Sequence, residues 1–298
     1  MSLRVTQNSV TALMLAGLHN NQSRLSTLEQ QLSSGRQISK PSDDPVGTDQ
    51  AMRYRADIAR NQQFQRNAQD GQAWLGTADG ALQNGVSILL RLQTLTTQAA
   101  NTGTGGATTN ATIATEVASL KQEMLGVANT TFDGRPIFGG TTSKTAAYVQ
   151  DSSGNVTYQG DAGKVLRTVG QNSQVQVNVD NTAAFGTPGN DVFAMFDQIT
   201  SDLQNNPANL TNDLTLIKNS LSQMTNAQAA EGSAYNRITA LTNTSTNLVT
   251  NLTANLSSVE DTDTAQIATE LTMQQASYQA SLSVMANVLQ MSLTDFLK

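Results

Sequence analysis

The chain has 298 residues, enough for two or three domains, and a net charge of −6. It has no cysteine and a single histidine, which excludes disulfides, thiol chemistry and the usual cysteine- or histidine-rich metal clusters. Aromatic residues make up only 4 % of the chain, and there is no dense basic patch of the kind that binds nucleic acid. We therefore expect no nucleic-acid partner, no cofactor, and a fold of long helices packed in thin layers.

The first predicted element is a helix over residues 3–34. Its larger apolar residues follow an alternating spacing of three and four, which places them on one stripe and is typical of a coiled-coil seam. The stripe consists of Met14, Leu18, Leu25, Leu28 and Leu32, with Asn21 in its one polar position. The lone histidine, His19, lies in this helix, and we interpret it as facing solvent or an interface because no catalytic motif accompanies it.

A dense helix-breaking segment follows Gly35. It contains Lys40, Pro41, Ser42, Asp43, Asp44 and Pro45. One of its polar residues, Ser42, Asp43 or Asp44, can cap the next helix, with the second proline in the first turn, where a missing N–H costs nothing. The two aspartates could instead bind a metal ion, but no other ligand cluster is near them, so we favour the cap.

A second long helix is predicted from about residue 46 to residue 100, and a third along the apolar stripe of residues 113–127. The flexible segment 101–106 between them predicts an antiparallel helical hairpin. We interpret Trp74 as core or interface filling rather than as a platform for a ligand. Four glycines weaken the second helix locally and would permit close helix approach: Gly71, Gly76, Gly80 and Gly85.

The pattern changes after residue 129. Residues 131–190 are rich in Gly, Thr and Val. Within them, Tyr148–Gln150 and Val156–Tyr158 flank a run of turn residues, which predicts a β-hairpin. We expect a small β domain inserted between two helical halves.

Helical spacing resumes over residues 192–203. Asn206 and Pro207 then form the pattern of an N-cap followed by proline at the first helical position. The stripe beyond them predicts one helix of about 50 residues, which residues 260–264 interrupt before a last helix at 267–296. The stripe of the last helix contains Leu271, Tyr278, Leu282, Met285, Leu289 and Phe296. Because this stripe matches that of the first helix, we expect the two ends of the chain to pair.

These elements predict a mainly α fold with a small inserted β domain, paired terminal helices that form a coiled coil, and a helical-bundle body. The N-terminal part of the chain is basic and the C-terminal part is acidic, so the two ends should attract each other weakly and in a salt-dependent way. The predicted domains are terminal helical arms at 1–40 and 262–298 that form an inner assembly domain, a helical rod domain at 41–130 and 191–261, and an inserted β domain at 131–190.

Five stretches resemble the bacterial flagellin family, in the family's order. The run from Leu25 to Arg36, leading into residues 67–71, resembles the N-terminal flagellin region. The turn from Lys40 to Gly47 resembles the variant of the hook-associated members, since flagellins proper more often lack its two prolines. The remaining resemblances lie in residues 129–141, 260–271 and 292–297.

The resemblance implies a structural subunit of the bacterial flagellum rather than an enzyme. It implies export of the unfolded chain through the flagellar type III apparatus, without a cleaved signal peptide, and a final place outside the cell. The subunits would assemble through their terminal helices as a junction ring. The implied partners are further copies of the chain, hook-associated protein 1, flagellin, and an export chaperone bound at the C-terminal arm.

Three alternatives stay open. The chain could be a flagellin that builds the filament itself, which the two prolines and the short insert disfavour. It could be an enzyme carried on a filament scaffold, although it has no zinc-protease motif, phosphate-binding loop or nucleophile elbow. It could also be a secreted coiled-coil protein such as a type III translocator or adhesin, which would explain the paired helices but not the order of the motifs. No stretch of the chain approaches the roughly 18 apolar residues of a membrane span.

The terminal stripes also predict, independently of the resemblance to flagellins, that assembly orders the ends of the chain. Two long helices that each carry a single apolar stripe cannot fully bury each other's apolar side chains. The isolated arms should therefore fray in the monomer. Packing against neighbouring subunits would then supply the missing burial and order the arms.

Overall fold

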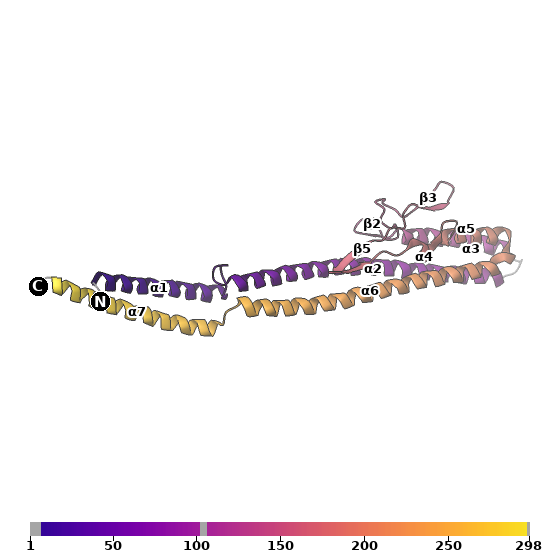
Figure 1. Ribbon diagram of the computed structural model, residues 1–298. Helices are drawn as coiled ribbons and strands as arrows, with labels where there is room; N and C mark the ends of the chain where they lie inside the picture. The colour runs from indigo at the N-terminus through magenta and orange to yellow at the C-terminus, as the bar shows by residue number, and fades with distance from the viewer. Residues whose placement is uncertain (1–6, 102–105, 297–298) are drawn as a thin grey trace. The chain divides into compact units, whose positions relative to one another are not determined.

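The computed structural model describes residues 7–101 and 106–296, and the side chains of residues 9–101, 106 and 108–287. Long helices dominate, and the small strands lie in the middle of the sequence, so the predicted fold class is confirmed (Figure 1). The long helices are α1 (Gln7–Ser34), α2 (Pro45–Asn101), α3 (Ala107–Ala128), α5 (Val192–Asn205), α6 (Leu210–Glu260) and α7 (Thr264–Phe296). None of the helices in the described ranges is both long and apolar enough to span a membrane.

The chain forms two compact units. One contains Met1–Arg60 and Leu248–Lys298, and the other contains Asn61–Asn247. Helices α2 and α6 contribute residues to both. The finer division into arms, rod and β domain remains a prediction.

The Asn61–Asn247 unit has its core between α2, α3, α5 and α6. Ion pairs join neighbouring helices: Arg91 on α2 pairs with Glu116 on α3, and Lys121 on α3 reaches Asp197 on α5 over 2.6 Å. The first pair joins the end of α2 to the beginning of α3, in the predicted antiparallel hairpin. Fully buried apolar side chains from all four helices form one cluster that includes Leu82, Leu89, Val117, Met124, Phe196, Ile199, Ile217 and Met224.

The glycines of α2 fall into two classes. A Cβ atom added at Gly85 would lie 2.6 Å from the sulfur of Met224 on α6, and one at Gly71 would lie 3.2 Å from Ile238 on the same helix. A Cβ atom at Gly76 or Gly80 would meet nothing within 4 Å. The prediction of close approach is therefore right for two of the four positions.

This contrast gives a matched pair of variants. Gly76→Ala should stabilise the protein by about 0.5–1 kcal/mol, because alanine is the better helix former and the position is open. Gly85→Ala should destabilise it by about 1–2 kcal/mol, because the new methyl group overpacks against a buried methionine. Urea denaturation followed by tryptophan fluorescence measures both. Equal shifts in the two variants would contradict the packing difference.

The middle of the sequence forms four two-stranded antiparallel pieces and one short helix, α4 (Asn181–Phe185). The predicted hairpin is confirmed, with Tyr148 paired to Tyr158 and Gln150 to Val156. The pairs are β1 (Thr131–Phe132) with β2 (Arg135–Pro136), β3 (Tyr148–Gln150) with β4 (Val156–Tyr158), β5 (Leu166–Gly170) with β6 (Ser173–Gln176), and β7 (Gly186–Thr187) with β8 (Asn190–Asp191).

Side-chain packing, rather than an extended sheet, holds this region together. Phe185 lies at the centre of an aromatic cluster, 4.9 Å from Phe138 and 5.7 Å from Tyr148, measured between ring centroids. The Tyr148 hydroxyl donates to Asn181 Oδ1 over 2.6 Å, and burial raises the pKa of this phenol above its usual value. Trp74 is buried against Phe132, with ring centroids 5.6 Å apart, so it fills the core as expected.

The residues between α5 and α6 differ in detail from the prediction. Pro207 does begin a helical turn, the 3-10 helix η2 (Pro207–Asn209). Asn206 occupies the N-cap position, but its side chain makes no capping hydrogen bond. Helix α6 then runs for 51 residues, as the long stripe predicts.

Candidate assembly surface

The terminal helices α1 and α7 lie side by side (Figure 1). Their seam is only partly closed: Leu28 and Ile267 are buried, whereas most of the predicted stripe is half-buried. The half-buried members are Met14, Leu18, Leu25, Leu32, Leu271, Tyr278 and Met285. Leu282, also predicted in the stripe, is exposed to 43 %. The side chains of Leu289 and Phe296 lie outside the described residues.

Polar residues occupy more of the seam than the apolar spacing indicates. Asn21 Nδ2 donates to Ser281 Oγ over 3.0 Å, and Gln274 Nε2 donates to Asn21 Oδ1 over 3.2 Å. Gln274 and Ser281 continue the four-and-three spacing between Leu271 and Met285, so position alone could have identified them. The apolar pattern alone indicates Leu282 instead, which lies one position beyond the seam residue Ser281.

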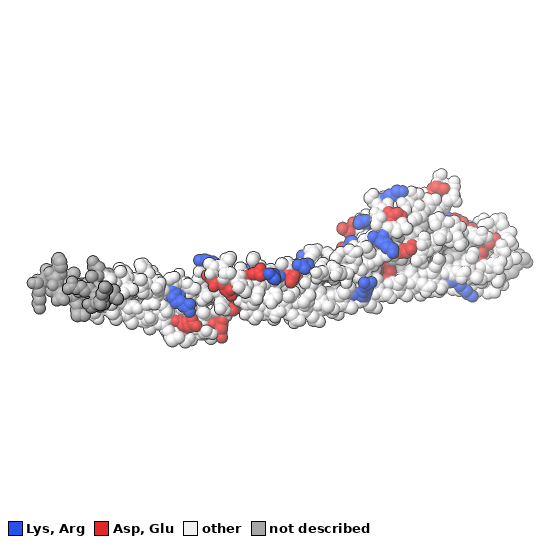
Figure 2. Space-filling model, in the orientation of Figure 1, with Lys and Arg blue, Asp and Glu red and all other residues white. Residues whose placement is uncertain are grey.

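The seam leaves a second set of apolar side chains in solvent. Leu13 on α1 is 71 % exposed, and Met273 and Val284 on α7 are 61 % and 54 % exposed. Figure 2 shows this part of the surface as mostly uncharged on the face drawn, with its charges near the ends of α1 and α7 that adjoin the connecting segments. Large apolar side chains that stay exposed on paired helices are candidates for packing against other molecules.

The turn between α1 and α2 is built by its two aspartates. Asp44 Oδ1 accepts hydrogen bonds from the backbone N–H groups of Val46 and Gly47, both over 3.0 Å, and so caps α2, which begins at Pro45. Asp43 Oδ2 accepts from the backbone N–H groups of Ser39 and Lys40 instead. Both carboxylates therefore satisfy backbone groups of the turn, while Lys40, Pro41 and Ser42 are exposed.

Glu260 joins this turn to the end of α6. Its carboxylate is almost fully buried and forms ion pairs with Arg36, over 3.2 Å, and with Arg55. Its backbone carbonyl accepts from Gln37 N–H over 2.7 Å, and Thr262 N–H donates to Gly35 over 3.1 Å. Sequence reasoning missed this site, because the two arginines lie in other helices and connections and nothing local links them to Glu260.

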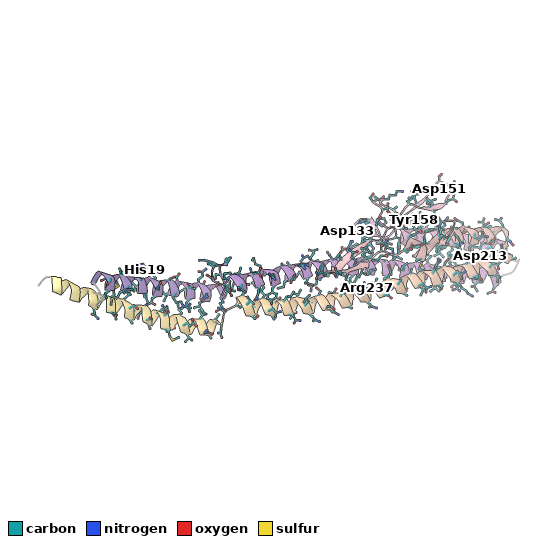
Figure 3. All side chains as sticks on the ribbon, viewed as in Figure 1. His19, Asp133, Asp151, Tyr158, Asp213 and Arg237 are labelled. Atoms are coloured by element: carbon teal, nitrogen blue, oxygen red, sulfur yellow. The ribbon has the colours of Figure 1, made fainter. Side chains whose placement is uncertain are left out.

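Catalytic features are sparse in the part of the chain that the structure describes. His19 is exposed on α1 (Figure 3). Within the described residues, no three or more His, Asp or Glu side chains gather in a way that could hold a metal ion. The exposed apolar side chains of the terminal helices are suited to packing against other chains.

Comparisons with known proteins agree with this description. The model of the bacterial flagellin N-terminal helical region matches residues 5–143, and that of the C-terminal helical region matches residues 214–297. The chain is 28 % identical to a flagellin of Bacillus subtilis over 95 % of both chains. It is 23 % identical to flagellar hook-associated protein 3 of Salmonella typhimurium over 98 % of both.

Solved structures share the fold. The flagellar junction protein FlgL from Legionella pneumophila superposes with a TM-score of 0.60 at 17 % identity. The match covers 71 % of this chain and 99 % of that one.

Proposed function

Since this chain belongs to the bacterial flagellin family of structural flagellar proteins, we propose that it forms the junction ring between hook-associated protein 1 and the flagellin filament. Similarity to hook-associated protein 3 over nearly the whole of both chains supports this function, as does the turn with Pro41 and Pro45. The observation that carries it is the set of exposed apolar side chains on α1 and α7.

In this proposal the terminal helices assemble with those of neighbouring subunits. Burial of a large apolar side chain contributes about 1.5–3 kcal/mol, so the exposed residues provide a driving force that the monomer does not use. The residues proposed to assemble are Met14, Leu18, Leu25, Leu28, Leu32, Leu271, Tyr278, Leu282, Met285, Leu289 and Phe296, with Leu13, Met273 and Val284 added from their exposure.

The same proposal includes the route and the partners of the chain. The subunit would leave the cell unfolded through the flagellar type III apparatus and act at the extracellular flagellum. Its partners would be other copies of itself, hook-associated protein 1, flagellin, and a chaperone that binds the C-terminal arm before export.

Removal of the exposed apolar side chains is expected to impair assembly while leaving the stability of the monomer almost unchanged. The double variant Leu13→Ser, Met273→Ser should change the free energy of unfolding of the monomer by only about 0.5 kcal/mol, because both side chains lie in solvent. Incorporation into hook–filament assemblies should fall about tenfold or more, because each lost burial weakens packing. Cosedimentation with hook-associated protein 1 and flagellin measures this. Val149→Ser, at a residue 47 % exposed in the β hairpin, is the control.

The arms are also expected to gain order on assembly. Limited proteolysis of the monomer should cut within α1 and α7 first, because their seam is half-buried and polar at Asn21, Gln274 and Ser281. The same sites should be protected in assembled filaments. Arms that resist cleavage in the dilute monomer would mean that the coiled coil is self-sufficient.

A second candidate is flagellin itself, which the 28 % identity to the Bacillus subtilis protein favours. The two functions differ in what the purified chain does alone. A filament subunit should polymerise into long homopolymers, whereas a junction subunit should stop after a ring. Electron microscopy of the purified chain under polymerising conditions distinguishes them.

A further inference from the structure

Methionine thioethers are the oxidisable sulfur atoms of this chain, which has nine methionines and no cysteine. Peroxides convert a methionine to its sulfoxide, and the reaction requires that the oxidant reach the sulfur. The exposure of each methionine side chain therefore decides which of them reacts.

The structure separates the described methionines by exposure. Met124 and Met224 have no exposed surface, and Met195 is 6 % exposed. Met273 on α7 is 61 % exposed and Met52 on α2 is 57 % exposed. The two half-buried methionines belong to the seam of the terminal helices: Met14 and Met285. Among the methionines whose side chains the structure describes, Met273 and Met52 are thus the most accessible to an oxidant.

Met273 lies on the outer face of α7. It follows the seam residue Leu271 by two positions, which is about 200° around a helix and so places it on the side away from α1. Val284, which is 54 % exposed, follows eleven residues later, or about three helical turns, and so shares this face. Met273 is therefore part of the exposed apolar set that is proposed above to pack against neighbouring subunits.

We propose that Met273 is an oxidative modification site, through which hydrogen peroxide prevents the free subunit from assembling. The thioether sulfur attacks one oxygen of the peroxide, so that an S–O bond forms while the O–O bond breaks. The sulfur is oxidised to a sulfoxide, and the second oxygen leaves with both protons as water. The peroxide comes from the medium, and the step consumes no other group of the protein.

Oxidation acts on assembly because it makes a large apolar side chain polar. In the monomer the sulfoxide oxygen stays hydrated, since Met273 is in solvent, so the fold is left almost unchanged. Burial of that oxygen against a neighbouring subunit without a hydrogen bond is unfavourable. The inference rests on the proposed function, and it implies that packing shields Met273 once the subunit has been incorporated.

Peptide mass spectrometry after brief treatment with hydrogen peroxide measures the rate of oxidation at each methionine. In the full-length natural monomer, Met273 should be oxidised about tenfold or more faster than Met124 and Met224, because their sulfur atoms are buried. In assembled protein, the rate at Met273 should fall about tenfold. A monomer rate at Met273 no higher than that at Met224, or no protection on assembly, would overturn the proposal.

A pair of leucine variants tests the effect on assembly. Met273→Leu keeps an apolar side chain of similar volume that peroxide cannot oxidise, and Met52→Leu is the control at a similarly exposed position. After peroxide treatment, the natural chain and Met52→Leu should incorporate into hook–filament assemblies about fivefold less well than before, whereas Met273→Leu should be unaffected. Both variants retain the seam methionines, so oxidation there cannot produce the difference. Equal losses in the two variants would overturn the proposal.

Reversal of the modification separates it from general damage. Methionine sulfoxide reductases A and B, supplied with dithiothreitol, should restore the incorporation of the oxidised natural chain. A defect that persists after Met273 has been reduced would overturn the proposal. If the untreated natural chain does not incorporate, the proposed junction function fails instead, and the rate of oxidation at Met273 in the monomer still decides whether this residue is the modified site.

Discussion

Replacement of Phe185 by alanine is expected to lower the free energy of unfolding of the Asn61–Asn247 unit by about 3–5 kcal/mol. Phe185 has no exposed surface, and its ring contacts those of Phe138, Tyr148 and Phe193. The small β pieces share no continuous sheet, so the aromatic cluster replaces the hydrogen bonding that would otherwise hold them. The cavity left by the ring would be closed only in part, because three rigid rings surround it.

Urea denaturation followed by the fluorescence of Trp74 is the measurement for this variant. Trp74 is the only tryptophan of the chain and is buried in the same unit, so its signal reports that unit alone. Leu166→Ala is the control, since this leucine is 46 % exposed in β5 and its loss should cost less than about 0.5 kcal/mol. Similar losses in both variants would argue against a cluster centred on Phe185.

The second large effect is a fall in stability as the pH rises from 4 to 7.5. Burial, and then the charge of Asp202 with its hydrogen bond, raises the pKa of Asp213 to about 6 from its usual 3.8. Both aspartates are buried, and Gln198 already donates to Asp202 over 2.7 Å. Because the folded-state pKa is raised, the stabilisation is complete below pH 3.8 and is lost as the pH rises through about 6. With allowance for solvent screening, the loss is about 2 kcal/mol.

Asp213→Asn isolates this contribution. The neutral amide can donate to Asp202 at any pH, so the variant should exceed the natural chain in stability by about 2 kcal/mol at pH 7.5 and by much less at pH 4. The raised pKa of Glu231 acts in the same direction in both proteins and cancels in the difference. Asp133→Asn, in the exposed turn of β1 and β2, is the control. A constant difference at both pH values would mean that Asp213 does not titrate in this range.

Local patterns of the sequence predicted the helices well. The long stripe after Pro207 corresponds to α6, and the turn residues between Gln150 and Val156 correspond to the β3–β4 hairpin. Both predictions rest on periodicity within one element, which depends on which face of that element is buried. The capping position of Asp44 was predictable for the same reason, since its bonds reach only two and three residues along the chain.

Features that need two distant segments were not predictable in this way. The ion pairs of Glu260 with Arg36 and Arg55 join residues that no local pattern relates. The burial of Glu231 and Asp213 depends on neighbours from other helices, and their polar character alone indicates exposure. Likewise, Gly85 and Gly76 lie in the same helix, and only the position of Met224 distinguishes them.

The pairing of α1 with α7 has a consequence for the order of folding. Asn21 and Ser281 are 260 residues apart in sequence, and Arg24 and Glu270 are 246 apart. Contacts across such a separation must close a very long loop, whereas the aromatic cluster closes far shorter ones. The Asn61–Asn247 unit can therefore form early, whereas during synthesis α1 cannot pair with α7 until α7 itself has left the ribosome.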